Sequence, residues 1–163
     1  MALFQHKTRI LLVCRENICR SPMAEGLLRY YLQQTELRDR VEINSAGTQA
    51  SQPGSRPDQR AQKVMALRGI NISRIKARRA TARDLVRSDF VFAMDESNLR
   101  DLWQLNLPEH HDKLSLLLSH HAGQPLLEVP DPYYGSIEAF ERVFQILDEA
   151  MGDVVFYIED CIL

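Results

Sequence analysis

Two cysteines and an arginine stand close together near the start of the chain, in residues 14–21 (CRENICRS). A cysteine thiolate is a strong nucleophile, and the planar guanidinium of Arg20 can hold two oxygens of one oxyanion. Backbone N–H groups of the intervening loop can converge on the same anion, and a following helix adds positive partial charge. The spacing therefore predicts an anion cradle in which Arg20 binds the anion and Cys14 attacks it as a stabilised thiolate.

Other roles for the cysteines can be weighed from the sequence. Free cysteines are often small, buried hydrophobic residues, so Cys14 and Cys19 could simply fill the core. A zinc site fails because no nearby Cys or His completes a set of four ligands. The third cysteine, Cys161, lies in a segment rich in Val, Phe and Ile and is expected in the core. An odd number of cysteines without a secretion signal excludes a disulfide scaffold and favours a reducing, cytoplasmic setting.

The cradle requires a strand that ends at Cys14 and a helix that begins about seven residues later. Residues 8–13 form a short apolar run typical of a buried parallel strand. Ser21 and Pro22 suit the N-cap and the first position of a helix. Further strands are predicted over 41–45, 90–94 and 114–118, and further helices over 57–67, 96–105 and 137–151, with a short helix capped by Thr81 and Asp84.

This alternation predicts an α/β fold, a single-domain, doubly wound (Rossmann-like), four-stranded parallel sheet flanked by helices across residues 1–163. Ligands of such sheets bind beyond the carboxyl ends of the strands.

The composition narrows the class of protein. The 163 residues include 20 basic and 22 acidic ones, for a net charge of −2, and 45% are hydrophobic. These values suit a globular protein and do not favour a nucleic-acid partner. No apolar run is long enough to predict a membrane segment. The basic stretch 74–83 is expected to be a solvated face that attracts an acidic phosphopeptide. The histidine pairs at 110–111 and 120–121 are expected to lie in solvated loops.

Four motifs, in this order, resemble those of the low-molecular-weight protein tyrosine phosphatase family. They are VCRENICRSP at 13–22, SAGT at 45–48, MDESNLR at 94–100 and DPYYG at 131–135. The resemblance covers nearly the whole chain. It implies hydrolysis of phosphotyrosine through a phosphocysteine intermediate, with no cofactor and no metal.

The resemblance also assigns roles. Cys14 would be the nucleophile, Arg20 would bind the phosphoryl oxygens, and Asp131 would be the general acid and base. From the residues alone, Asp131 could equally be a turn residue before Pro132. The phosphate-binding loop would comprise Arg15, Glu16, Asn17, Ile18, Cys19 and Ser21, with Ser45 as its support and Tyr133 and Tyr134 in the substrate cleft. Asn17 would adopt a left-handed backbone conformation and bond to Ser21 and Ser45. Cys19 would also be a redox partner that traps oxidised Cys14 as a disulfide.

Three positions depart from the family pattern. Glu16 replaces a glycine inside the loop, and its charge is expected to weaken phosphate binding unless it points outward and pairs with Arg15. Ile75 replaces a histidine that would anchor Asn17. Ser51 replaces an aromatic residue of the cleft wall, which lowers the expected selectivity for phosphotyrosine.

Three alternatives follow from these features. The protein could be a catalytically weakened phosphoprotein-binding or oxyanion-binding module. Protein-arginine phosphatases place threonine where Ile18 stands, which favours the phosphotyrosine activity here. A thiol-dependent arsenate reductase would need two further cysteines, and none lies between Arg20 and Asp160. The expected partners are a tyrosine-phosphorylated protein and a tyrosine kinase whose action the enzyme opposes, with no nucleic acid and no membrane, and the expected state is a monomer or weak dimer.

Overall fold

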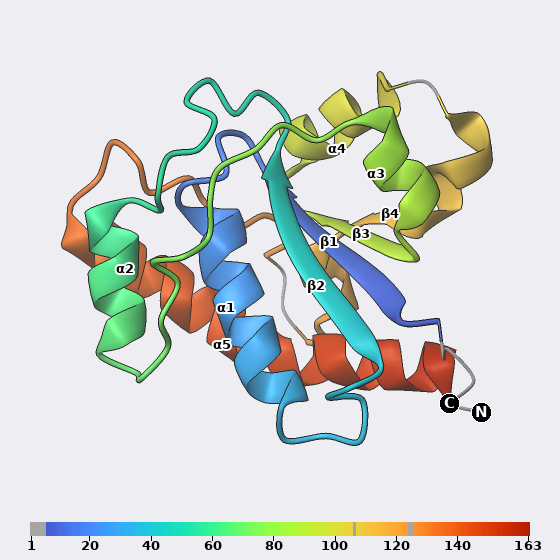
Figure 1. Cartoon of the computed structure of the whole chain (residues 1–163). Coiled ribbons are helices and arrows are strands. Elements are labelled where there is room, and N and C mark those ends of the chain that lie inside the picture. The colour runs from blue at the N-terminus through green and yellow to red at the C-terminus, as the bar shows by residue number, and fades with distance from the viewer. Residues whose placement is uncertain (1–5, 106, 124–125) are drawn as a thin grey trace.

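The computed structural model describes residues 6–105, 107–123 and 126–163, and it confirms the predicted parallel sheet (Figure 1). All three strand pairings are parallel, and the spatial order is β2-β1-β3-β4. The chain moves from β1 outward to β2 and then returns to the other side of β1 to form β3, so the switch point lies between β1 and β3. The strands are β1 (Thr8–Cys14), β2 (Val41–Gly47), β3 (Phe90–Ala93) and β4 (Leu114–Leu116).

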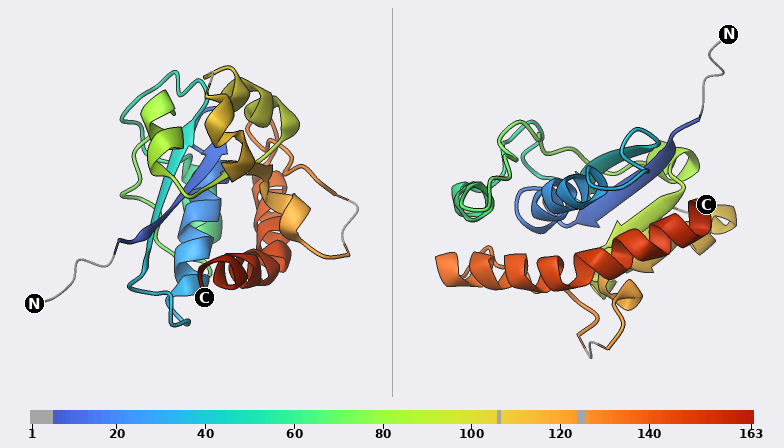
Figure 2. Two further views of the ribbon diagram at one scale, coloured as in Figure 1. Left: turned by 90° about the vertical axis from the view of Figure 1, so that its right-hand side faces the viewer. Right: turned by 90° about the horizontal axis from the view of Figure 1, so that it is seen from below.

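Helices cover both faces of the sheet, as the alternation of side chains along β1 requires. Ile10 and Leu12 belong to a large apolar cluster, whereas Leu11 and Val13 belong to a smaller one on the opposite face. The larger cluster lies under α1 (Arg20–Leu32), α2 (Gln59–Ala66) and α5 (Ile137–Ile162), and the smaller one under α3 (Ala82–Arg87) and α4 (Glu96–Trp103). Figure 2 shows α5 running along one side of the molecule beside α1.

Several element boundaries differ from those predicted. Ser21 is not the N-cap of α1, because the helix begins at Arg20 and Cys19 is its N-cap. The Ser21 hydroxyl lies in the loop network described below and does not cap the helix. The predicted cap at α3 is confirmed as a capping box between Thr81 and Asp84. Strand β4 is only three residues long, and the chain then forms a 3₁₀ helix, η2 (Leu117–His120); another, η1 (Pro108–Lys113), precedes β4.

The predicted environments of Cys161 and of both histidine pairs are wrong. His110 and His111 lie in η1 and are half-buried. Cys161 is exposed, because it follows Ile158, the last buried residue of α5. His120 stacks on Tyr157 at 4.0 Å between ring centroids, so it is half-buried. His121 is also half-buried, and its Nδ1 lies 2.6 Å from a carboxylate oxygen of Asp153.

The described residues, 6–105, 107–123 and 126–163, contain neither a membrane-spanning helix nor a cluster of metal ligands. Within these ranges, no helix combines the length and apolar character that crossing a bilayer demands. In the same part of the chain, no three side chains of the His, Cys, Asp or Glu type come together in a way that could hold a metal ion.

Candidate active site

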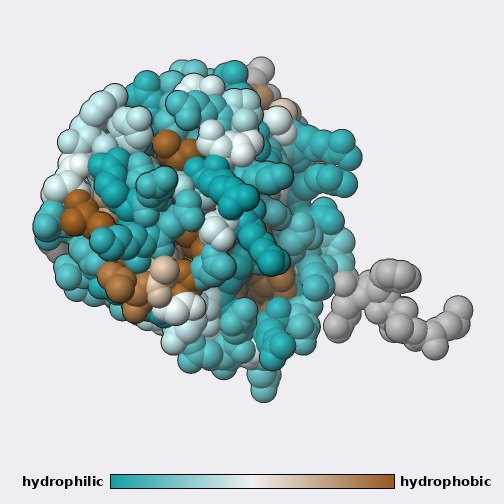
Figure 3. Space-filling model, turned by 60° about the vertical axis from the view of Figure 1, so that its left-hand side comes forward, coloured by the Kyte–Doolittle hydropathy of each residue, from teal (hydrophilic) through white to brown (hydrophobic). Residues whose placement is uncertain are grey.

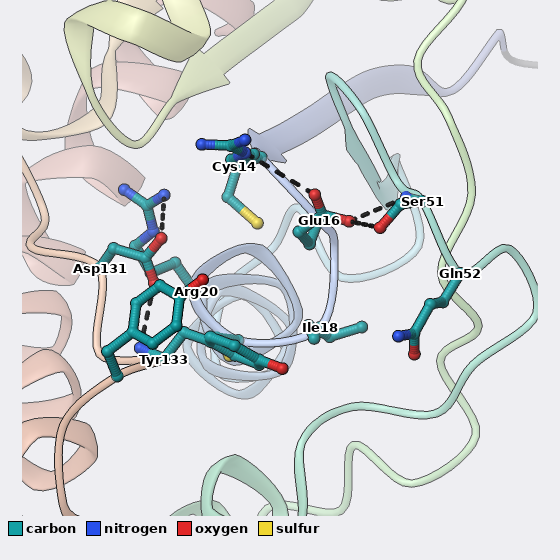
Figure 4. A pocket seen from close by; sticks show the side chains of 11 residues that line it. Cys14, Glu16, Ile18, Arg20, Ser51, Gln52, Asp131 and Tyr133 are labelled. Atoms are coloured by element: carbon teal, nitrogen blue, oxygen red, sulfur yellow. Dashed lines mark hydrogen bonds and ion pairs between the residues drawn. The ribbon is translucent and has the colours of Figure 1, made fainter.

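The loop between β1 and α1 forms the floor of a cavity of about 240 Å³ at the carboxyl end of the sheet (Figure 4). Cys14 is the last residue of β1 and Arg20 is the first of α1, so the two elements fix both ends of the loop. The lining residues come from three segments: Cys14, Arg15, Glu16, Ile18, Cys19 and Arg20 from this loop, Ser51 and Gln52 from the segment after β2, and Asp131, Tyr133 and Tyr134 from the segment before α5.

Backbone carbonyls of the loop are bound on its outer side. Cys14 O accepts from Thr48 N at 2.9 Å, and Arg15 O accepts from Gln49 N at 2.9 Å and from Ala50 N at 3.1 Å. A planar peptide directs its N–H away from its carbonyl, so carbonyls held outward turn the following N–H groups toward the interior of the loop. An oxyanion in the cavity would therefore meet backbone donors and the N-terminus of α1, whose first turn contains no acidic residue.

Gly47, the last residue of β2, lies very close to the backbone of the loop, which is possible only because it has no side chain. A Cβ atom at Gly47 would lie 2.6 Å from Arg15 O and 2.9 Å from the carbonyl carbon of Glu16, both of them backbone atoms. Backbone atoms cannot move aside as the end of a long side chain can, so any larger residue would displace the loop. The glycine of the SAGT motif is thus a steric requirement of the cradle.

The Cys14 thiol is buried and faces two donors. Its Sγ lies 3.0 Å from Ser21 Oγ and accepts from Asn17 N at 3.3 Å. Asn17 has a positive φ of 61°, and its Nδ2 donates to Ser21 Oγ at 2.9 Å and to Ser45 Oγ at 3.0 Å. Because Ser21 Oγ accepts from Asn17, its own proton can be donated either to Cys14 Sγ at 3.0 Å or to Ala46 O at 3.4 Å, and a thiolate at Cys14 is the closer acceptor.

The backbone of Arg78 supplies an anchor for Asn17. The sequence predicts that one anchor is missing, because Ile75 stands where a histidine would bond to Asn17. Arg78 N donates to Asn17 Oδ1 at 3.0 Å, so a backbone group binds the amide oxygen although Ile75 has no polar side chain. Ile75 instead packs against the larger apolar cluster. Asn17 therefore uses both its amide donors and its acceptor.

Arg20 is held by two carboxylates. Its side chain is only 3% exposed; Nη1 donates to Asp95 Oδ2 at 2.5 Å and to Val129 O at 3.0 Å, and Nη2 lies 3.5 Å from Asp131 Oδ2. Burial alone would lower the pKa of Arg20, but the charges of Cys14, Asp95 and Asp131 outweigh it and raise that pKa, so the guanidinium stays cationic.

Asp131 lies in the same cavity as Cys14, on the opposite side from Ser51 (Figure 4). Its side chain is 47% exposed, and Oδ1 accepts from Tyr133 N at 3.1 Å. The rings of Tyr133 and Tyr134 meet edge to face with centroids 4.9 Å apart, and Tyr134 is 95% exposed. This arrangement gives the mouth of the cavity one aromatic wall beside a carboxyl group.

The opposite wall is polar. Glu16 Oε2 accepts from Ser51 N at 2.8 Å and from Ser51 Oγ at 2.7 Å, and Oε1 lies 3.7 Å from Arg15 Nε. These hydrogen bonds from Ser51 lower the pKa of Glu16, so its carboxylate is charged. The charge nevertheless points at Ser51, as Figure 4 shows, and is close to the guanidinium of Arg15.

Cys19 is the last loop residue before α1, and its side chain is buried. Burial, together with the charges of Asp58 and Cys14, raises the pKa of the Cys19 thiol far above its usual value. Both Cys14 and Cys19 are free thiols. Cys19 is thus protonated while it remains in this environment.

Sequence analysis missed three contributors to the site. Asp95 follows β3 directly, as Cys14 ends β1, and that shared strand-end position was the available signal. Glu25 is buried on α1, where it accepts from Ser45 Oγ at 2.5 Å and pairs with Arg29. Its signal was a carboxylate one helical turn after Ser21. Arg60 gave no signal, because only the folded chain brings α2 beside the segment before α5.

Comparison with known proteins places these features in context. A family model described as low molecular weight phosphotyrosine protein phosphatase matches residues 9–159. The phosphatase of that name from Mus musculus is 39% identical over 137 residues, covering 83% of this chain and 86% of its own. A putative low molecular weight protein-tyrosine-phosphatase from Synechocystis is 34% identical, covering 90% and 94%. The crystal structure of a protein tyrosine phosphatase from Entamoeba histolytica, with Hepes in its active site, has a TM-score of 0.90 and 32% identity, covering 96% of this chain and all of that one.

Proposed function

The chain belongs to the low molecular weight phosphotyrosine protein phosphatase family, and we propose that it hydrolyses phosphotyrosine in proteins with Cys14 as the nucleophile. One observation carries this proposal. The thiol of Cys14, the buried guanidinium of Arg20 and the carboxyl group of Asp131 line a single cavity at the switch point of the sheet. These are a nucleophile, an anion-binding group and a proton donor, the three that transfer of a phosphoryl group from a phenol requires.

In the first step, the Cys14 thiolate attacks phosphorus while Arg20 and the loop N–H groups bind the equatorial oxygens. The S–P bond forms, the bond from phosphorus to the phenolic oxygen breaks, and Asp131 gives its proton to the departing oxygen. The Ser21 hydroxyl, 3.0 Å from Sγ, stabilises the thiolate before attack. The products of this step are tyrosine and a phosphocysteine.

In the second step, the Asp131 carboxylate takes a proton from water as the water oxygen attacks phosphorus. The S–P bond breaks and returns the thiolate, and inorganic phosphate leaves. Asp131 is suited to both steps because it is half-exposed and can exchange protons with solvent. Arg20 keeps its orientation throughout, since Asp95 and Val129 O hold Nη1.

The test is a comparison of matched peptides carrying phosphotyrosine, phosphoserine or phosphoarginine, with the Cys14→Ser variant as the control. We expect turnover of the phosphotyrosine peptide by the native chain and none by the variant. Turnover of phosphoserine in preference to phosphotyrosine would overturn the assignment. Oxyanion binding without any turnover would instead favour the weakened binding module.

The remaining expectations form part of the same proposal. The match over residues 9–159 supports one phosphatase domain. A phosphorylated protein is the substrate class that the family implies, and a tyrosine kinase would supply it. A reducing compartment such as the cytoplasm suits a mechanism that needs a free thiol at Cys14.

A further inference from the structure

The segment that begins at the polar wall of the cavity carries an excess of positive charge. Residues 51–80 contain eight basic residues and one acidic residue, a net charge of +7, although the whole chain carries −2. The other 133 residues, with 12 basic and 21 acidic side chains, therefore carry −9. The eight basic residues are Arg56, Arg60, Lys63, Arg68, Arg74, Lys76, Arg78 and Arg79.

Four of these cations form a group that we call the basic rim: Arg56, Arg74, Lys76 and Arg79. All four are exposed, and among the described residues none of them pairs with a carboxylate. By contrast, Arg60, Arg68 and Arg78 are neutralised by Asp58, Glu141 and Asp84. The eighth, Lys63, is exposed but lies in α2, outside the rim. Within the described residues, the rim is thus a source of positive potential that no direct ion pair neutralises.

Backbone hydrogen bonds tie the basic rim to the cavity wall. Gly54 N donates to Ala77 O at 2.7 Å, and Ala77 N donates to Ser55 O at 2.8 Å, so the two segments run side by side (Figure 1). Gly47 N donates to Arg78 O at 2.8 Å, further along the same pairing. Ser51 and Gln52 line the cavity, so the rim residues that adjoin Gly54 and Ala77 lie next to the segment that forms this wall, although none of them lines the cavity itself.

The surface around α2 supports contact with a polar partner. Hydrophilic side chains dominate the side of the molecule that carries α2 and its neighbouring loops, with apolar residues only in small separate spots (Figure 3). A charged surface of this kind attracts an oppositely charged ligand, and it raises the association rate more than it raises the affinity of the complex.

From these observations we infer that the basic rim is a docking surface for acidic residues that flank the phosphotyrosine of the substrate. The inference rests on the proposed function and extends it by naming the substrate class. A peptide whose phosphate occupies the cradle must leave the cavity past Ser51 and Gln52 or past Tyr133 and Tyr134. A peptide that leaves on the first side meets the rim, and Asp or Glu side chains there gain favourable charge interactions.

The experiment compares three phosphotyrosine peptides of equal length whose flanking residues are acidic, neutral or basic. For the native chain, kcat/KM should be about fivefold higher for the acidic than for the neutral peptide and lowest for the basic one. Raising the ionic strength from low to high should remove most of that preference, because exposed charges are screened. The hydrolysis of p-nitrophenyl phosphate, which has no flanking residues, serves as the reference rate for each variant.

A double variant, Arg74→Glu with Lys76→Glu, should lose or reverse the preference when rates are expressed relative to p-nitrophenyl phosphate. Arg38→Glu is the matched control, because Arg38 is also exposed but precedes β2, at the opposite end of that strand from the cavity. Equal rates for the three peptides, or the same loss in the Arg38 variant, would overturn the inference. So would binding of DNA or anionic vesicles by the rim without peptide preference. Failure of the proposed function would look different, because then no phosphotyrosine substrate would be hydrolysed.

Discussion

Glu16 and Ser51 are joined by two hydrogen bonds, from Ser51 N at 2.8 Å and from Ser51 Oγ at 2.7 Å to the same carboxylate oxygen. Both residues depart from the family pattern noted in the sequence, and the structure shows that they contact each other. The carboxylate of the phosphate loop thereby holds the segment after β2, where Ala50 has a positive φ of 42°. The two departures form one unit, so their effects on activity should not be additive.

The charge and the hydrogen bonds of Glu16 can be separated by substitution. In Glu16→Gln the side-chain oxygen can still accept from Ser51, but the negative charge near the bound dianion is gone. We expect the inhibition constant of phosphate to fall about threefold, since the charge is part-exposed and part-balanced by Arg15. Inhibition of p-nitrophenyl phosphate hydrolysis by added inorganic phosphate measures this constant.

The variant Glu16→Ala reports on the hydrogen bonds from Ser51, because it removes the acceptor as well as the charge. Its gain in phosphate affinity should be smaller than that of Glu16→Gln, as the wall at Ser51 is released. An unchanged inhibition constant in Glu16→Gln would show that the charge carries no penalty.

Asp131→Asn should slow the enzyme in proportion to how much protonation the leaving group needs. For phosphotyrosine, whose phenolate is a poor leaving group, we expect kcat to fall about 10²- to 10⁴-fold. For a phosphate ester of a strongly acidic phenol, the loss should be much smaller. Pre-steady-state release of the phenol measures the first step alone, and equal losses for both esters would contradict the role as general acid.

Oxidation should join Cys14 and Cys19 in a disulfide. Peroxide converts the Cys14 thiolate to a sulfenic acid, and the Cys19 thiolate then attacks its sulfur and displaces hydroxide. Because burial raises the pKa of Cys19, this second step should become faster as the pH rises. The activity that a thiol reductant restores after exposure to peroxide measures how much of the enzyme formed this reducible disulfide. Cys19→Ser should regain far less activity after the same exposure, and equal recovery would exclude Cys19 as the resolving thiol.

His120 should make the free energy of unfolding depend on pH. Burial lowers the pKa of His120, so the unfolded chain binds its proton more readily than the folded one. The free energy of unfolding is therefore greatest at a pH well above about 6.5, the pKa of histidine in the unfolded chain. It decreases as the pH falls through that pKa toward the lower pKa of His120 in the folded chain. The slope from this group is at most about 1.4 kcal/mol per pH unit.

Urea unfolding between pH 7.5 and 5 tests this expectation, and His120→Gln should have a flatter dependence. Among the described residues, those that contact the His120 ring are uncharged: Ser115 bonds to its Nε2, and Phe92 and Tyr157 pack against the ring. Identical slopes in the native chain and the variant would rule out His120 as the cause.

The sheet and its order of elements were predictable because local signals agree with the fold. The apolar run before Cys14 and the Thr81–Asp84 cap depend on residues close in sequence. The contacts of Arg20 with Asp95 and of Asn17 with Arg78 join residues 75 and 61 positions apart, so no local pattern shows them. Cys161 illustrates the opposite error, because an apolar neighbourhood in sequence does not show which side of a helix faces solvent.

The start of α2 touches both halves of the catalytic site. Asp58 N donates to Ile18 O at 2.8 Å in the phosphate loop, while Arg60 donates to Tyr133 O at 3.0 Å and to Gly135 O at 2.8 Å beside the general acid. Asp58 and Arg60 are themselves joined by several hydrogen bonds. A span of three residues therefore links the phosphate loop to the segment that carries the general acid, and a displacement of α2 would act on both.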